Sequence, residues 1–306
     1  MCKAPPHICI CICTYKRPEY LRNLLSRLQN LETNGKFTYS VNVVDNDPCR
    51  SSMAVVEEMK TRAVVGLNYL HEPKRNIAAA RNKAMENAEG DYAAFIDDDE
   101  LPERDWLLNM HDTLEKCGAD GVLGPVNPYF ESEPPDWIVK GKFCERPAHE
   151  TGKVLHWSQS RTGNVLFRLG IIEDRRNAFD EDFGLGGEDV RFFKNLAGKG
   201  RVFVWCNESP VKEMVPKERC TKIYFLKRSF LQGNVSANYY KDDNEMKHRS
   251  YNISKSAMAI LSYTIILPGA LLLGTEIAMK YLTKHVYHVG RLLSSLGIRT
   301  IKERYI

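Results

Sequence analysis

The first half of the chain alternates short apolar runs with longer segments of helical periodicity. Runs rich in Ile, Val and Ala predict β-strands, and segments in which leucines recur every three or four residues predict helices. The predicted strands are 8–13, 41–44, 64–70, 92–96 and 121–123, and the predicted helices begin at Pro18, Ser51, Ile77 and Trp106. Strands that alternate with helices indicate βαβ units and a parallel sheet. We therefore predict an α/β fold, with an open, mostly parallel, Rossmann-like sheet and helices on both faces.

From Pro125 the pattern loosens into a stretch with several prolines. Short strands are predicted at 154–157, 164–168 and 201–205, and a helix at 188–197 follows the glycine-rich turn 184–187. Beyond Pro216 the composition is helical throughout. The pattern predicts one large domain over 1–215, in two halves of about 1–125 and 126–215, followed by a helical region over 216–306.

The helical region contains twenty consecutive residues without a charge, Ser256–Thr275. A helix of this length can cross the hydrocarbon of a bilayer. Pro268-Gly269 interrupts the run, however, and both flanks are basic, which places both flanks on the cytoplasmic face. This pattern favours a re-entrant hairpin broken at Pro268-Gly269, or in-plane helices, over a full span. The alternative is a pair of buried helices that completes the core.

Composition and charge narrow the class of protein. The chain has 306 residues, 43% hydrophobic and 27% charged, which excludes collagen-like and disordered proteins. Residues 241–306 hold ten Lys/Arg and five Asp/Glu, so the positive excess lies in the helical region. An anionic partner is expected there, either membrane headgroups or nucleic acid. The chain has nine cysteines and no predicted secretory leader, which indicates a cytosolic compartment.

Four consecutive acids, Asp97-Asp98-Asp99-Glu100, directly follow the strand 92–96. Ligands bind outside the carboxyl ends of the strands in an open parallel sheet, and these acids fall there. Carboxylate oxygens suit Mg²⁺ or Mn²⁺, which also bridge diphosphates. The alternative is a solvated acidic turn that caps the helix after Pro102, because acids favour helix N-termini.

Six short motifs follow one another along the chain. They are Cys13-Thr14-Tyr15-Lys16-Arg17-Pro18, Val43-Val44-Asp45-Asn46, Ala80-Arg81-Asn82, Gly90-Asp91, Phe95-Ile96-Asp97-Asp98-Asp99 and Gly186-Gly187-Glu188-Asp189. Their order and spacing resemble those of the family-2 inverting glycosyltransferases of the GT-A fold, over about residues 7–235. Within that family the segment 75–82 is most similar to bacterial exopolysaccharide enzymes of the succinoglycan glucosyltransferase type.

The resemblance implies a nucleotide-binding half over 1–125 and an acceptor half over 126–215. Thr14 and Arg17 would border the nucleotide, and Asp45 would accept the N–H of uracil. Arg81 would face the diphosphate or the base. The remaining assignments concern the acidic run: Asp97 and Asp98 would hold the ribose and the sugar, and Asp99 would hold Mn²⁺ or Mg²⁺.

The acid pair Glu188-Asp189 follows the glycine-rich turn at the start of a predicted helix. Inverting transfer needs a carboxylate that takes the proton of the acceptor hydroxyl. By resemblance Asp189 is that base, and Glu188 orients the acceptor. The alternative is an acid pair that offsets the helix dipole. Glu213, after the last predicted strand, is a weaker candidate for a further ligand.

Together these features predict a metal-dependent hexosyltransferase on the cytoplasmic face of the plasma membrane, attached through its C-terminal helices. The expected donor is a UDP-sugar, with glucose as the transferred hexose, and the expected acceptor is a lipid-linked oligosaccharide of exopolysaccharide synthesis; nucleic acid is not expected as a partner. Two alternatives stay open. One is a membrane-tethered module that binds nucleotide sugar or glycan without transfer. The other is a sugar-nucleotide pyrophosphorylase, although Thr14–Pro18 lacks the glycine-rich phosphate loop of such enzymes.

Overall fold

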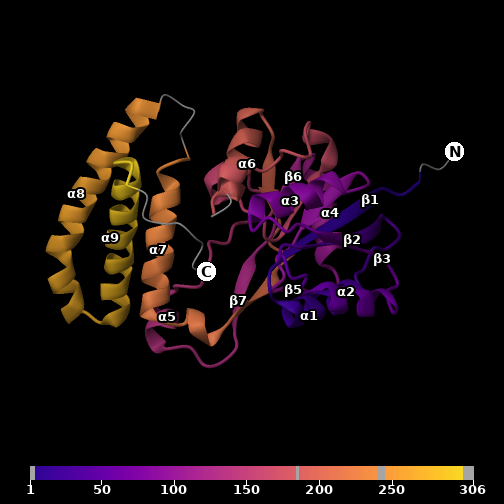
Figure 1. Cartoon of the computed structure of the whole chain (residues 1–306), viewed down its shortest axis with the longest axis horizontal. Helices are drawn as coiled ribbons and strands as arrows, with labels where there is room; N and C mark the ends of the chain where they lie inside the picture. The colour runs from indigo at the N-terminus through magenta and orange to yellow at the C-terminus, as the bar shows by residue number, and fades with distance from the viewer. Residues whose placement is uncertain (1–3, 184–185, 240–244, 299–306) are drawn as a thin grey trace. The chain divides into compact units, whose positions relative to one another are not determined.

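A seven-stranded sheet forms the core of the first half of the chain (Figure 1). The computed structural model describes residues 4–183, 186–239 and 245–298. The strand order is β3-β2-β1-β4-β8-β6-β9, and only β8 runs antiparallel to its neighbours. The expected mostly parallel open sheet is therefore confirmed. The strands are β1 (His7–Thr14), β2 (Thr38–Asp45), β3 (Gly66–His71), β4 (Tyr92–Phe95), β6 (Gly121–Leu123), β8 (Val165–Arg168) and β9 (Phe203–Trp205).

Helices cover both faces of this sheet, as expected. On β1 the side chains of Ile8, Ile10 and Ile12 pack on one face, and those of Cys9 and Cys11 pack on the other. All five are fully buried, so these two cysteines serve as small apolar residues. The isoleucine face packs against α1 (Pro18–Leu28), α2 (Met53–Lys60) and α4 (Trp106–Cys117), and the cysteine face against α3 (Ile77–Glu86) and α6 (Glu188–Gly198).

A second sheet has three strands in the order β5-β10-β7. They are β5 (Glu100–Pro102), β10 (Val211–Val215) and β7 (Val126–Phe130), and β5 pairs antiparallel with β10 so that Glu100 lies opposite Glu213. The sequence pattern did not predict these strands, because each is short and interrupted by charge or proline. The predicted strand 154–157 is wrong. Val154 makes an isolated bridge to Val204, and Trp157–Gln159 is a short 3-10 helix capped by His156.

The chain divides into two compact units. The first spans Met1–Pro128, Arg146–Gly184 and Glu188–Met214, and the second spans Tyr129–Glu145, Leu185–Gly187 and Val215–Ile306. Of the predicted glycine-rich turn, Gly184 and Leu185 lie outside the described residues. So do residues 299–306 of the predicted helical region.

Four helices build the second unit: α5 (Asp136–Gly141), α7 (Lys222–Ser236), α8 (Glu245–Leu272) and α9 (Thr275–Ser295). Helix α9 packs against both α7 and α8 (Figure 1). Glycines allow close approach where α7 meets α9, because a Cβ on Gly233 would collide with the Tyr287 backbone and one on Gly290 with the Phe230 carbonyl. A small core of Ile138, Phe225 and Met279 lies in the same unit.

Helix α8 runs unbroken through Pro268, so the break expected at Pro268-Gly269 is wrong. Pro268 has no amide hydrogen to donate to the carbonyl of Thr264, so one helical hydrogen bond is lost there, but the helix continues to Leu272. The chain instead reverses at Gly274, which has a φ of +119°. Within the described part of the chain, one helix is long and apolar enough to cross a membrane by length and composition, His248–Leu272.

Candidate active site

The acidic loop Asp97–Asp99 joins the large sheet to strand β5. It leaves the large sheet after β4, beside the end of β1, and enters the small sheet at β5. The loop is held at both ends, because the amide of Ile96 donates to the carbonyl of Cys11 and the amide of Met214 donates to the carbonyl of Asp99. The acids therefore lie at the carboxyl edge of the sheet, as the sequence predicted.

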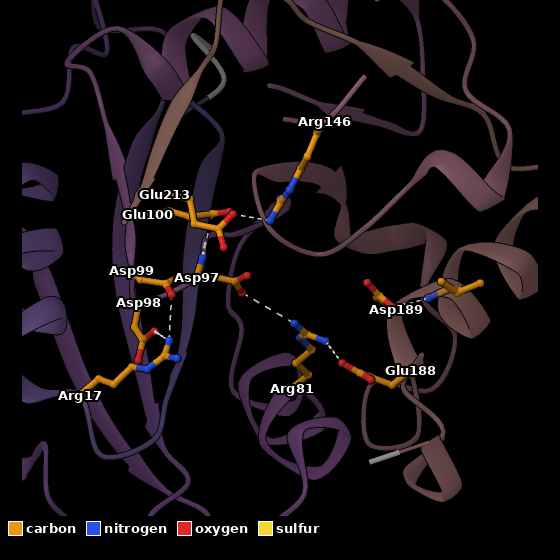
Figure 2. Close-up of polar contacts among 11 residues, drawn as sticks. Arg17, Arg81, Asp97, Asp98, Asp99, Glu100, Arg146, Glu188, Asp189 and Glu213 are labelled. Atoms are coloured by element: carbon orange, nitrogen blue, oxygen red, sulfur yellow. Dashed lines mark hydrogen bonds and ion pairs between the residues drawn. The ribbon is translucent and has the colours of Figure 1, made fainter. Parts of the chain in front are cut away.

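Arg17 joins two of these acids (Figure 2). Its Nη1 donates to Oδ1 of Asp98 at 3.1 Å and to Oδ2 of Asp99 at 2.9 Å. Thr14, the last residue of β1, donates from Oγ1 to Oδ2 of Asp98 at 2.7 Å. The structure thus brings together Thr14, Arg17, Asp98 and Asp99, and in it Arg17 neutralises part of the acidic loop.

Burial raises the pKa values of three neighbouring carboxyl groups, those of Asp98, Asp99 and Glu100. The pKa of Asp99 rises to about 7, mainly because the side chain is removed from water and further because Asp98 lies beside it; Arg17 opposes the shift. Burial also raises the pKa of Asp98, and it raises that of Glu100 well above the usual range. Removal from water therefore makes these carboxyl groups harder to ionise than free side chains, and Arg17 only partly offsets this effect.

Arg81 links the acidic loop to the predicted acid pair. The side chain leaves α3, is almost fully buried, and pairs with Glu188 at the start of α6. Its Nη2 also lies 3.7 Å from Oδ1 of Asp97. Figure 2 shows Arg81 between these two carboxylates, which come from residues far apart in the sequence. Arg81 therefore contacts protein carboxylates in this structure, rather than standing open toward a diphosphate or a base.

The neighbouring Asn82 fixes the segment that precedes α6. Its side chain donates to the carbonyl of Phe179 at 2.9 Å and accepts from the amide of the same residue at 2.8 Å. The Arg81 guanidinium lies over the Phe179 ring, 5.8 Å from its centre. The motif Ala80-Arg81-Asn82 therefore positions α6, and with it Glu188 and Asp189.

We predict that Arg81→Met destabilises the protein by about 3–5 kcal/mol, because the substitution leaves the buried Glu188 without its cation. Urea unfolding at neutral pH measures this loss. Arg104→Met is the matched control, because Arg104 is mostly exposed and its ion pair with Glu32 is worth about 1 kcal/mol or less. Equal, small effects in both variants would show that the Arg81 pair contributes little to stability.

The two acids at the start of α6 differ in environment. Glu188 is buried and paired with Arg81, whereas Asp189 is half-buried and its Oδ1 accepts a hydrogen bond from the amide of Val190. Asp189 lies close enough to Arg81 to contribute to the raised pKa of the guanidinium. Figure 2 shows both acids across Arg81 from the acidic loop.

Asp45 lies at the end of β2 and is fully buried. Its carboxylate accepts hydrogen bonds from the amides of Asp47 and Ser52 and from the hydroxyl of Tyr69. These bonds hold the loop that follows β2. Because Asp45 is fully buried, a hydrogen bond from uracil would require this loop to move.

An ion pair beside the acidic loop was not predicted from the sequence. Arg146 pairs with Glu213 on β10, opposite Glu100, and both side chains are mostly buried (Figure 2). Arg146 lies in the proline-containing stretch without periodicity, so no signal identified it. Gly163 leaves room beside the same acids, because a Cβ there would lie 2.7 Å from Oε1 of Glu100.

The donor set of the acidic loop fits a divalent cation that has other ligands as well. Oε1 of Glu100 is buried and has no hydrogen-bond partner among the described residues, and Asp99 is crowded by Asp98. Within residues 4–183, 186–239 and 245–298, no three His, Cys, Asp or Glu side chains are arranged to hold a metal ion by themselves. Mg²⁺ in proteins is often bound by one or two carboxylates together with substrate phosphates, which is the arrangement that this loop allows.

Comparison with known proteins agrees with this fold. S. aureus TarS in complex with UDP superposes with a TM-score of 0.53 at 14% identity, covering 95% of this chain and 92% of that chain. The mannosyltransferase PcManGT from Pyrobaculum calidifontis, in complex with GDP-Man and Mn²⁺, gives a TM-score of 0.66 at 18% identity. The superposition covers 96% of this chain and 88% of PcManGT. The fold is therefore that of the GT-A glycosyltransferases.

The sequence comparisons define the family. The family model described as glycosyl transferase family 2 matches residues 9–174. The succinoglycan biosynthesis protein ExoM of Rhizobium meliloti is 30% identical over 305 residues, 97% of this chain and 95% of ExoM. The chain belongs to glycosyl transferase family 2, and its resemblance to succinoglycan-type enzymes is confirmed.

Proposed function

We propose that this protein is an inverting hexosyltransferase that moves glucose from UDP-glucose to a lipid-linked oligosaccharide during exopolysaccharide synthesis. The full-length similarity to ExoM supports the biosynthetic context, and TarS bound to UDP supports a uridine donor. The choice of glucose depends on the resemblance to succinoglycan glucosyltransferases. The observation that carries the proposal is the pairing of Arg81 with Asp97 and Glu188, because it joins the acidic loop to the acid pair of α6.

In this proposal the acidic loop binds the donor. Asp99 would hold Mn²⁺ or Mg²⁺, and Asp97 and Asp98 would contact the ribose and the sugar. A bound cation would neutralise the charge that develops on the departing diphosphate. Thr14 and Arg17 already contact Asp98, so they would border the nucleotide and keep the acids in place.

The base in this proposal is Asp189 rather than Glu188. Glu188 is buried and paired with Arg81, so that carboxylate is held in an ion pair. Asp189 is more accessible and lies at the start of the same helix. As the acceptor oxygen attacks the anomeric carbon, its proton moves to Asp189 and the bond from that carbon to the diphosphate breaks. A single displacement of this kind inverts the configuration.

A screen of UDP-sugars for UDP release, with lipid-linked acceptor in the assay, tests the proposal. We expect release with UDP-glucose and a product of inverted anomeric configuration by NMR. Binding of UDP without release in the presence of acceptor would identify a tethered binding module. Formation of UTP and sugar phosphate when pyrophosphate is added would identify a pyrophosphorylase.

We predict that binding of Mn²⁺ with UDP strengthens as the pH rises through 7. The pKa of Asp99 without metal is about 7, so below that pH a proton competes with the cation for the carboxylate. Calorimetry from about pH 6 to about pH 8, in buffers of different ionisation enthalpy, measures both the affinity and the proton released. Asp99→Asn should flatten this dependence, and an unchanged slope in that variant would assign the proton to another group.

The C-terminal helices are proposed to attach the enzyme to the cytoplasmic face of the membrane, where a lipid-linked acceptor is available. The long apolar helix α8 and the positive excess of residues 241–306 support this attachment. Both features suit a surface of anionic lipid.

A further inference from the structure

Helix α8 has an apolar outward face. Four large apolar side chains on it, spaced three to seven residues apart, are 64–88% exposed. This spacing places them along one side of the helix, and no charged residue interrupts them. They are Met258, Leu261, Ile265 and Leu272, and we call this row the apolar stripe. An exposed apolar patch of this kind marks an interaction site.

The opposite side of α8 is the more polar one. Asn252 and Ser256 are buried, Asn252 pairs with Arg291 of α9, and Ser256 lies 3.4 Å from Nδ1 of His288. Further along, the hydroxyl of Thr264 lies 3.2 Å from Nε2 of His285. Polar groups are therefore among those that face the neighbouring helix, whereas the large side chains of the apolar stripe face outward. A helix on the surface of a water-soluble protein usually buries its large apolar side chains instead.

We propose that α8 lies in the plane of an anionic membrane with the apolar stripe inserted among the acyl chains, and that it does not cross the bilayer. This inference rests on the membrane attachment put forward above and defines its geometry. The apolar stripe contacts lipid rather than a second protein, because the same helix pair carries the exposed residues Lys255, Lys280 and Lys284. The C-terminal region also carries the positive excess of the chain, which suits anionic headgroups.

The register between α8 and α9 argues against a hairpin inserted end-on. Because Thr264 contacts His285, the exposed Lys284 lies level with the middle of the apolar stripe, and Lys280 lies one turn closer to Gly274. An upright hairpin would carry Lys284 to the depth of Ile265 and Lys280 about one turn deeper, toward Leu272. In the in-plane arrangement the lysines can reach the headgroups. From Met258 to Leu272 the stripe is about 21 Å long, shorter than the roughly 30 Å of hydrocarbon.

Depth measurement distinguishes the two orientations. In full-length protein with exposed Cys49 and Cys117 replaced by Ser, the variants Met258→Cys, Ile265→Cys and Leu272→Cys would carry an environment-sensitive fluorophore. The vesicles are phosphatidylcholine with one third phosphatidylglycerol and nitroxide lipids of known depth. We expect the three labels at depths within about 5 Å of one another. A steady increase in depth toward Leu272, by about 20 Å, would overturn the proposal in favour of end-on insertion.

A charge in the apolar stripe tests the contact itself. Ile265→Asp should weaken binding to the same vesicles at least about tenfold. The position is exposed, so an aspartate leaves the fold intact, but its charge is unfavourable among acyl chains. Val64→Asp is the matched control, because Val64 is equally exposed but lies in the first unit. Equal binding of the two variants, or a lipid-free dimer that does not bind vesicles, would overturn the proposal.

Two separate measurements distinguish failure of the proposed membrane geometry from failure of the proposed enzymatic function. Transfer, measured as UDP release with lipid-linked acceptor dissolved in detergent, should be the same for wild type and Ile265→Asp, because the apolar stripe lies outside the catalytic machinery. Loss of vesicle binding with unchanged UDP release supports the membrane geometry. Absence of UDP release in the wild type with intact vesicle binding would count against the enzymatic proposal alone.

Discussion

Replacing Asp189 with Asn should lower the rate of transfer about a thousandfold while leaving UDP binding unchanged. The loss has the size expected for removal of a general base, because the acceptor hydroxyl would have to lose its proton to water. Donor binding should persist, since the nucleotide contacts are proposed to come from Thr14, Arg17 and the acidic loop. UDP release in the presence of acceptor measures the first quantity, and calorimetry with Mn²⁺ and UDP measures the second.

The matched control for this variant is Asp136→Asn. Asp136 is also an acid in the first turn of a helix, α5, and it is highly exposed. If the acid at position 189 only offsets a helix dipole, each variant would lose about 0.3–1 kcal/mol of stability and neither would lose activity. That result would remove Asp189 from the mechanism.

Asp99→Asn should weaken metal-dependent binding of UDP by at least about 100-fold, because a direct ligand contributes at least as much as the outer-shell groups whose loss costs about 10–100-fold in metal affinity. Calorimetric titration of UDP with and without Mn²⁺ separates the metal-dependent part. Asp91→Asn is the control, since Asp91 precedes the same strand β4 at its opposite end and accepts a hydrogen bond from the amide of His7.

The stability of the Asp99→Asn variant provides an internal check. The pKa of Asp99 is raised in the folded protein, so ionisation of this carboxylate opposes folding increasingly as the pH rises above the unfolded-state pKa. Without metal, the variant should therefore be at least as stable as the wild type near pH 8. Equal loss of UDP binding with and without Mn²⁺ would contradict the assignment of Asp99 to the metal.

The sequence predicted the large sheet well because its strands are long apolar runs. In β1 and β2 nearly every side chain is buried on one face or the other, and such strands have a clear sequence signal. The strands β5 and β10 lack that signal. Glu100 and Glu213 are paired across these two strands, and the context that makes them strands lies more than a hundred residues away.

The candidate site was predicted at the level of residue types and strand ends. The acidic loop and its neighbours Thr14 and Arg17 lie together, because the ends of adjacent parallel strands must meet at one edge of the sheet. The partners of Arg81 were not foreseen, since a helix pattern shows which face is apolar but not which distant carboxylate a buried arginine will meet. Arg146 gave no signal at all. The roles assigned to the site residues stay predictions; these are Thr14, Arg17, Asp45, Arg81, Asp97, Asp98, Asp99, Glu188 and Asp189.

The segment that follows β4 is secured at both ends, by β1 of one sheet and by β10 of the other. A loop of three residues that is hydrogen-bonded at both ends has little conformational freedom, so the positions of its carboxylates are fixed. In the proposed function, a sugar nucleotide bound there would have to adapt to these fixed carboxylates. Any movement that encloses the substrate would then come from other parts of the chain, and changes in donor preference would arise from residues around the loop.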